Sequence, residues 1–230
     1  MSSELQLGGA PLTLKPNRRA RRLRLRVDAR TRSLTLTVPP GVSRRRALEW
    51  AAGHADWAAQ SIGAIAESVA IAPGAALPLF GAPHRIDWVG GVRRVTRADE
   101  RLVVGGPAEG LEGRVLRWLK SEALALLSSE TQEFAAKAEV TVSSVAVGDP
   151  RSRWGSCASD GRIRYSWRLI MAPDFVRRAT VAHEVAHRIH MDHSPRFHAL
   201  VRELLGADPT PARLWLRREG GALHRIGSQR

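Results

Sequence analysis

The stretch VAHEVAHRIHMDHSPRF, residues 181–197, contains the residue pattern that constrains the fold most strongly. His183 and His187 are four residues apart, so on an α-helix their side chains project from one face, about 40° apart around the axis. Glu184 follows His183 directly and lies about 100° further round. The segment therefore predicts a helix that presents two imidazoles and a carboxylate at one surface.

Two imidazoles at this spacing are suited to a metal ion. Neutral histidine nitrogens bind Zn²⁺, and a catalytic zinc combines three protein ligands with an open position for water. In the HExxH pattern the metal lowers the pKa of that water, and the glutamate takes its proton as the water attacks a carbonyl carbon. The pattern predicts zinc-dependent hydrolysis with Glu184 as general base, and it requires one further ligand.

Three histidines downstream are candidates for the third ligand. His190 would lie close to the same face if the helix continued, and it is our second choice. His193 lies in MDHSP, a segment whose polar residues and proline favour a turn, so the chain can fold back and aim this imidazole at the metal. We predict His193 as the third ligand, with His198 starting or lining the next helix.

The same motif also occurs in unrelated helices, where its histidines are ordinary side chains of a partly buried helix and its glutamate is a solvated charge. Here the apolar residues recur at helical spacing and predict a seam that faces the core: Phe175, Ala179, Ala182, Ala186 and Ile189. The histidines flank this seam. We therefore expect them to border a cleft.

Length and composition are ordinary for a globular protein. The 230 residues can bury a sizeable core, as one domain with an extension or as two small ones. No apolar run reaches 18 residues and the N-terminus lacks a signal-peptide pattern, so we expect no membrane association and a cytoplasmic location. The single cysteine, Cys157, excludes an internal disulfide and agrees with a reducing compartment.

The formal net charge of +14 comes mainly from arginine. A charge of this size attracts polyanions at low salt. A genome that favours arginine codons produces the same balance without any role in nucleic-acid binding. Association with nucleic acid is therefore one of two interpretations of the charge.

The N-terminal segments 21–27 and 33–38 alternate between apolar and polar residues. This period predicts a β-hairpin with a basic outer face, which we interpret as a solvated strand face. Ser43 is expected to cap a helix that runs to about residue 66, with its two tryptophans as core anchors.

The remaining segments predict short strands and amphipathic helices. We expect strands within 77–89, 101–104, 141–147 and 161–170, and helices over 114–138, 195–205 and 208–219. The helix over 114–138 should pack on the helix of the HExxH motif, and the tail from Gly220 should be flexible. These elements indicate an α+β protein with a β-rich N-terminal region containing one helix, residues 1–108, and a catalytic domain, residues 109–230.

Several of these segments carry a family resemblance. RWGSC at 153–157, GRIRYSWRLIMAP at 161–173, HEVAH at 183–187 and DHSPRF at 192–197, with RRLRLRVDARTRSLTLTVPPGV at 21–42 and LFGAPHRI at 79–86, together resemble the YgjP-like metallopeptidases, relatives of the SprT-type zinc proteases. The resemblance implies a zincin-like catalytic domain whose HExxH helix lies beside a mixed or antiparallel sheet. It also implies zinc on His183, His187 and His193, with Glu184 as general base.

Two residues depart from the family pattern, and one rival family shares the ligand spacing. Ser166 stands where the family commonly has asparagine, and His198 where it has an aromatic residue, so both departures concern the substrate pocket. The position of His193 also matches the metzincins. That resemblance is weakened by His190, where metzincins need a glycine, and by the absence of a methionine after Met191.

Other residues are candidates for contacts with the substrate. Arg153 could stabilise the developing oxyanion or hold a turn, and Tyr165 could donate to the same oxyanion or serve in packing. Asp192 could orient an imidazole or cap a turn. A strand that borders the cleft could pair with an extended substrate through main-chain hydrogen bonds.

These observations predict a zinc metallopeptidase that hydrolyses peptide bonds in a peptide or protein substrate through a zinc-activated water. The alternative is a basic protein associated with nucleic acid. It would be either an SprT-like protease acting on DNA-bound proteins or a binding module with a structural zinc.

Overall fold

The structure is a computed structural model, in which residues 5–28, 31–64 and 69–227 are described. The chain forms two compact units, one within residues 1–68 and the other comprising Val69–Gly227. Each unit has a core of its own.

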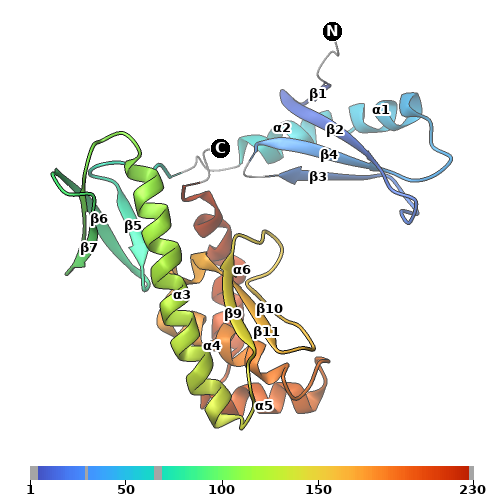
Figure 1. The fold of residues 1–230 in the computed structure, drawn as a ribbon. Coiled ribbons are helices and arrows are strands. Elements are labelled where there is room, and N and C mark those ends of the chain that lie inside the picture. Colours follow the sequence, from blue (N-terminus) through green and yellow to red (C-terminus); the bar gives the residue numbers. More distant parts are fainter. Residues whose placement is uncertain (1–4, 29–30, 65–68, 228–230) are drawn as a thin grey trace. The chain divides into compact units, whose positions relative to one another are not determined.

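The first unit is a four-stranded sheet covered by two helices. Its strands are β1 (Gln6–Leu7), β2 (Ala10–Pro16), β3 (Arg24–Asp28) and β4 (Ser33–Val38), in the order β1-β2-β4-β3 (Figure 1). Strands β3 and β4 are antiparallel, which confirms the predicted hairpin. Strand β2, which the sequence did not predict, pairs with β4 in parallel and with β1 antiparallel.

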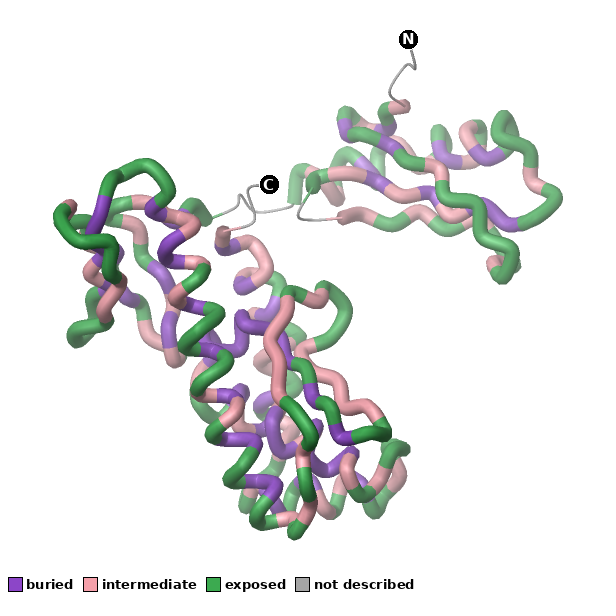
Figure 2. Tube along the Cα trace, viewed as in Figure 1, coloured by how far each residue is buried: buried purple, intermediate pink, exposed green. Residues whose placement is uncertain are grey.

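Alternation along β4 explains which face the helices cover. Leu34, Leu36 and Val38 are buried, and buried and half-buried positions alternate along the strand (Figure 2). They share a core with alanines of the two helices, α1 (Arg44–Ala52) and α2 (Ala55–Gly63). The period-2 pattern thus sets one face of the sheet against the helices and leaves the other open.

The single helix predicted from Ser43 to about residue 66 is wrong, because the chain forms two helices that break at Gly53 and His54. Ser43 does cap α1, since its hydroxyl accepts from the backbone N–H of Arg46 at 3.3 Å. After the break Trp57 is 45% exposed, so it is not the predicted core anchor. Residues 65–66 of the predicted helix lie outside the described residues.

The second unit begins with a small mixed sheet. Its strands are β5 (Ala76–Leu79), β6 (Ala82–Gly90), β7 (Val95–Ala98) and β8 (Arg101–Gly105), in the order β5-β6-β8-β7. Their buried residues, among them Leu79, Ile86 and Val104, belong to the same core as the long helix that follows. The strands therefore belong to one compact unit with that helix, whereas the sequence analysis divided the chain between residues 108 and 109.

The rest of the second unit is a three-stranded mixed sheet surrounded by helices. The helices are α3 (Leu111–Lys137), α4 (Asp174–Ala186), α5 (Pro195–Leu205) and α6 (Thr210–Arg225). The strands β9 (Ser144–Gly148), β10 (Gly155–Cys157) and β11 (Arg162–Ser166) have the order β10-β11-β9, with β10 antiparallel and β9 parallel to β11. Helix α3 packs along α4 as predicted (Figure 1). The protein is α+β, and the HExxH helix lies beside a mixed sheet as expected.

Three local predictions in this unit are wrong. The strand expected over 161–170 stops at Ser166, whose hydroxyl accepts from the N–H of Arg168 and caps a 3₁₀ helix, η1 (Trp167–Met171). The predicted seam of α4 fails at both ends, because Phe175 is 49% and Ile189 is 47% exposed. The tail predicted from Gly220 continues as helix to Arg225.

Helix α4 is held at its start by a buried ion pair. Arg177 is 4% exposed and Glu130, on α3, is 7% exposed; Arg177 Nη2 and Nε lie 2.8 and 3.0 Å from the carboxylate oxygens of Glu130. Arg177 also donates to Asp174 at 2.8 Å. The charges of both buried groups are thereby compensated, which fixes α4 against α3.

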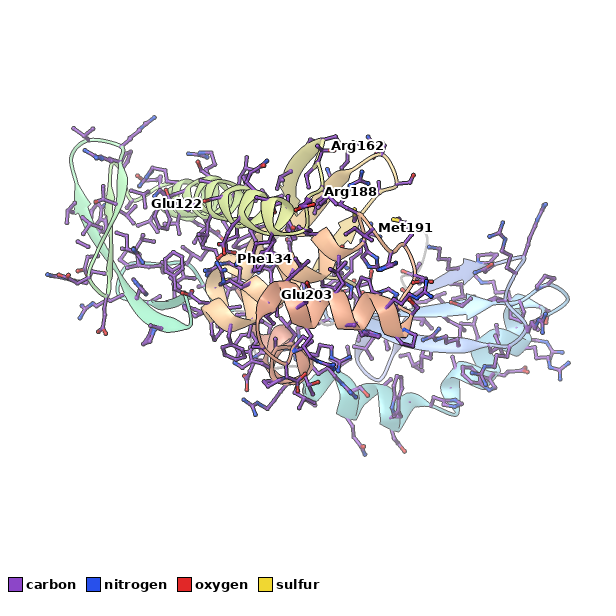
Figure 3. The ribbon with its side chains drawn as sticks, turned by 90° about the horizontal axis from the view of Figure 1, so that it is seen from below. Glu122, Phe134, Arg162, Arg188, Met191 and Glu203 are labelled. Atoms are coloured by element: carbon purple, nitrogen blue, oxygen red, sulfur yellow. The ribbon has the colours of Figure 1, made fainter. Side chains whose placement is uncertain are left out.

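The chain just after α4 is held by a second arginine. Arg188 donates to the carbonyl oxygens of Thr141 and Ser159, at 3.1 and 3.0 Å, and so joins this segment to the loops of the β9–β11 sheet. Figure 3 shows Arg188 on the side of the molecule where Arg162 projects from β11. The two arginine contacts secure the two ends of the helix that carries the HExxH motif.

Within the described residues, no helix combines the length and the apolar character needed to cross a membrane.

The ion pair between Arg177 and Glu130 predicts a large effect of removing one partner. In Glu130→Gln the guanidinium stays buried beside a neutral amide, so we expect the free energy of unfolding to fall by about 3–5 kcal/mol in urea denaturation. The control is Glu133→Gln, which affects an exposed pair with Arg178 and should cost less than about 1 kcal/mol. Equal losses in the two variants would contradict the role assigned to the buried pair.

Candidate metal centre

Helix α4 places His183 and Glu184 in its last turn and ends at Ala186, so that His187 is its C-terminal cap residue. The N–H groups of Arg188 and Ile189 then bond to the carbonyl oxygens of Val185 and Ala186, which closes a tight turn. The helix therefore does not continue to His190, and the chain is free to reverse.

The reversal is completed by the start of α5. The Ser194 hydroxyl accepts from the N–H of Phe197, and Pro195 occupies the first helical position, where its fixed φ favours a helix start. Asp192 accepts from the N–H of Ser194 at 3.2 Å, which shapes the turn. This geometry brings His193 back onto the face of α4.

The structure brings together the three histidines that the sequence singled out. Nε2 of His193 lies 3.2 Å from Nε2 of His183, and one ring nitrogen from each of His183, His187 and His193 lies within 4.8 Å of the others. Two nitrogens that bind one tetrahedral zinc at about 2.1 Å are separated by about 3.4 Å. The three side chains are thus compatible with a single shared metal ion.

A backbone contact fixes the orientation of His187. Its Nδ1 lies 2.9 Å from the carbonyl oxygen of His190, so Nδ1 carries the proton and donates it, and Nε2 remains available as a ligand. The imidazole of His190 is not part of the group of three. His198 lies in α5, with its ring centroid 6.3 Å from that of His193, so it lines the next helix as expected.

Phe197 is the residue of the site that the sequence analysis did not single out. Its fully buried ring stacks on His187 with 4.5 Å between centroids, and it meets His183 and His193 edge-on, each at 4.8 Å. All three imidazoles therefore pack against one aromatic side chain. Its position one turn into α5 offers no signal beyond the apolar period of that helix.

The imidazoles of His183 and His187 are held in the neutral form. Burial lowers the pKa of His183 to about 4, and the nearby His187 and His193 act in the same direction. Burial also lowers the pKa of His187. Neutral imidazoles have a free lone pair on one ring nitrogen, which is the form that binds a divalent metal.

Glu184 is the acidic residue beside the histidines. It is 6% exposed, and burial raises the pKa of its carboxyl group to about 7, against the opposing effect of the Arg153 guanidinium. The backbone of β10 passes so close that a Cβ added at Gly155 would lie 2.5 Å from Oε1 of Glu184. The absence of a side chain at Gly155 therefore provides the space that the carboxylate occupies.

A pocket of about 340 Å³ opens beside this carboxylate. His183, Glu184 and His193 form one wall. The other walls come from the segment before β10 with β10 itself, from α5, and from the loop before α6 with α6: Arg153, Trp154, Gly155, His198, Val201, Pro209, Ala212, Arg213 and Leu216. The contribution of α6 was not foreseen, because it depends on the tertiary packing of a helix that begins at Thr210, well beyond the motif.

The two predicted substrate contacts differ in position. Arg153 lines the pocket. Tyr165 is fully buried, its hydroxyl lies 3.0 Å from the hydroxyl of Thr131 on α3, and burial raises its pKa. The structure therefore brings Arg153, but not Tyr165, to the pocket beside Glu184.

The packing of Phe197 predicts that it positions the imidazoles. In Phe197→Leu the rings lose their shared aromatic contact, so we expect the affinity for Zn²⁺, measured by competition with a chelating dye, to fall roughly tenfold. The control is Phe175→Leu, which changes an exposed side chain of α4 and should leave the affinity unchanged. An unaltered affinity in Phe197→Leu would contradict this role.

Comparison with known proteins agrees with the geometry. The sequence model of the YgjP-like metallopeptidase domain matches residues 21–219. Searches of curated proteins and of solved structures found no match. The matched range includes every residue of the pocket and most of the first unit, and so covers most of the chain. The chain belongs to the YgjP-like metallopeptidase family.

Proposed function

We propose that this protein is a zinc-dependent peptidase in which His183, His187 and His193 hold the metal and Glu184 is the general base. The observation that carries the proposal is the meeting of three imidazoles at the edge of a pocket, directly beside a buried carboxylate. Family membership supports peptide or protein substrates.

The donor set favours zinc over Mg²⁺ and Ca²⁺. Imidazole nitrogens suit zinc, whereas Mg²⁺ and Ca²⁺ prefer oxygen ligands. Zinc, when bound, supplies a Lewis acid that makes a water molecule nucleophilic near neutral pH. With three protein ligands, one coordination position is left for that chemistry.

Glu184 performs the proton transfers in the proposed mechanism. Its carboxylate accepts a proton from the water that attacks the scissile carbonyl carbon, and it then donates this proton to the nitrogen of the leaving amine. A general base works best with a pKa near the operating pH, and burial raises the pKa of the Glu184 carboxyl group towards neutrality. Because Gly155 has no side chain, the carboxylate of Glu184 has room beside the pocket, and helix α4 fixes the position of Glu184.

Arg153 is proposed to stabilise negative charge on the oxygen of the scissile carbonyl. It is exposed, it lines the pocket, and its charge opposes the raised pKa of Glu184, so its guanidinium acts on the reaction centre electrostatically. A cation in this position offsets charge that arises in the transition state. Tyr165 has no part in the proposed mechanism, because its hydroxyl is buried against Thr131.

Strand β10 is proposed to align the substrate. It lies at one edge of the β10-β11-β9 sheet and next to α4, so its outer backbone groups are available to an extended peptide. One substrate side chain would then enter the pocket, where Val201, Ala212 and Leu216 provide an apolar wall. This arrangement favours an apolar residue next to the cleaved bond.

Two substitutions separate metal binding from proton transfer. In Glu184→Gln the ligands are intact, so we expect one zinc per chain by mass spectrometry but at least a hundredfold slower cleavage of a quenched-fluorescence peptide library, in the range typical of a lost general base. In His183→Ala we expect loss of both the metal and the cleavage.

The outcomes are distinguishable. If Glu184→Gln cleaves as fast as the wild type, the assignment of the general base is wrong. If His183→Ala retains a full equivalent of zinc, the proposed ligand set is wrong. Wild-type protein treated with a chelator and then reloaded with zinc provides the control for recovery of activity.

The close approach of β10 predicts a further effect on activity. In Gly155→Ala the added methyl would displace the Glu184 carboxylate, so we expect the turnover number to fall at least tenfold while the zinc content stays at one per chain. The control is Gly148→Ala in β9, where an added Cβ meets only ordinary contacts with Arg164. Unchanged turnover in Gly155→Ala would show that the carboxylate position is not critical.

A further inference from the structure

The open face of the sheet in the first unit carries a regular array of polar side chains. The register pairs Lys15 with Thr37 and Thr37 with Arg24, so these three residues form one row across β2, β4 and β3. A second row, of Thr13, Thr35 and Arg26, lies beside it. We call these six residues the basic sheet face.

The opposite face of the same strands is the one that packs against the helices. Leu12, Leu34 and Leu36 alternate with the residues of the basic sheet face and are buried in the core with α1 and α2. Lys15, Arg24 and Arg26 are exposed, and the central threonines are half-buried. The sheet thus has one apolar, covered face and one open face of hydroxyls and cations.

The cations of this face are not neutralised by neighbouring carboxylates. Within the described ranges, Lys15, Arg24 and Arg26 form no ion pair. Asp28 lies on the same face of β3, two residues after Arg26 and opposite Ser33, and its carboxylate accepts from the N–H of Thr31. In the second unit, by contrast, Arg162, Arg168 and Arg177 each pair with a carboxylate.

The charge distribution along the sequence agrees with the concentration of cations here. Residues 1–68 contain 12 lysines and arginines but only 5 aspartates and glutamates, so less than a third of the chain carries half of the net charge of +14. Four further arginines, at 18, 19, 21 and 22, are exposed in the loop that joins β2 to β3, next to the row containing Lys15 and Arg24.

The spacing of the array suits a linear polyanion. Neighbouring strands are about 4.8 Å apart, so Lys15 and Arg24 stand roughly 10 Å apart on the two sides of a track of threonine hydroxyls along β4. Hydroxyl, ammonium and guanidinium groups are the side chains that contact the phosphate oxygens of nucleic acids. A phosphate backbone running along β4 would meet hydroxyls in the middle and cations on both sides.

The face lacks the features of two other modes of binding. It has no aromatic residue, so it provides no platform on which bases could stack. It also has no large apolar side chain that could insert into a membrane, which surface helices of membrane-binding proteins use together with their charge. Without base stacking or membrane insertion, the remaining mode of binding is contact with phosphate groups. Such contacts carry no sequence information.

We propose that the basic sheet face binds the phosphate backbone of a nucleic acid without preference for sequence. The proposal concerns the first unit and does not depend on the zinc site or on catalysis. It revises the interpretation of the hairpin as a merely solvated strand, because the parallel strand β2 turns a two-stranded surface into a three-stranded one with cations on both sides.

The test compares two triple variants of the full chain with equal changes in net charge. Lys15→Gln, Arg24→Gln and Arg26→Gln neutralise the face. The matched control is Arg44→Gln, Arg45→Gln and Arg46→Gln, which removes three exposed arginines from α1, the helix packed on the opposite side of the sheet. Binding is measured by fluorescence anisotropy with a short labelled DNA duplex, an RNA duplex and a single strand, over a range of NaCl concentrations.

We expect the wild type to bind at least one of the three nucleic acids, with an affinity that falls steeply as salt rises. The face variant should bind roughly tenfold or more weakly at about 0.1 M NaCl, and its salt slope should be shallower by about 0.9 for each lost phosphate contact. The control variant should stay within about twofold of the wild type. Equal melting temperatures would show that all three proteins are folded.

Three results would overturn the proposal. The first is equal loss of affinity in the two variants, which would mean that net charge alone attracts the nucleic acid. The second is absence of wild-type binding at about 50 mM salt. The third is binding to phosphatidylserine vesicles without binding to any nucleic acid, which would assign the face to a membrane surface.

Discussion

The end of helix α4 at Ala186 is the constraint on which the candidate metal centre depends. A continued helix would carry residue 193 about 9 Å further along the axis from His187, out of reach of a shared ion. Because the helix stops, the chain turns within the eight residues 187–194 and a new helix starts at Pro195, so that Nε2 of His193 lies 3.2 Å from Nε2 of His183. The turn is stabilised by the hydrogen bond from His187 to the carbonyl of His190, so the same contact holds the turn and orients the His187 imidazole.

Contacts at both ends of α4 stabilise this arrangement, although it requires the burial of polar groups. The ion pair of Arg177 with Glu130 fixes the start of the helix, and the contacts of Arg188 fix the segment beyond its end. Between them, Glu184 is kept in an environment that disfavours its charged form. The packing of the core thus keeps Glu184 in a site that raises the pKa of its carboxyl group. Carboxyl groups with shifted pKa values are common in active sites.

Much of the fold followed from periodicity in the sequence. Alternation predicted the pair β3 and β4, and the helical period predicted α3, α4 and α5, because these patterns report which face of an element is buried. Strand β2 was missed because its partner in the sheet is β4, and β3 lies between the two in the sequence. Local patterns in the sequence do not report such a pairing. The break at Gly53 and the 3₁₀ helix after Ser166 were missed because local capping overrode the expected continuation. At the site, the histidine spacing and the turn-forming residues predicted the position of His193. The roles of Phe197 and of the pocket wall from α6 were not predicted, because they depend on tertiary packing.

Anomalous scattering from a crystal of the zinc-loaded protein, recorded at the zinc absorption edge, tests the central claim most directly. The account predicts one strong peak about 2.0–2.1 Å from a ring nitrogen of each of His183, His187 and His193, with the carboxylate of Glu184 facing the remaining coordination position. A peak bound by other residues, or a site in which His193 takes no part, would contradict it.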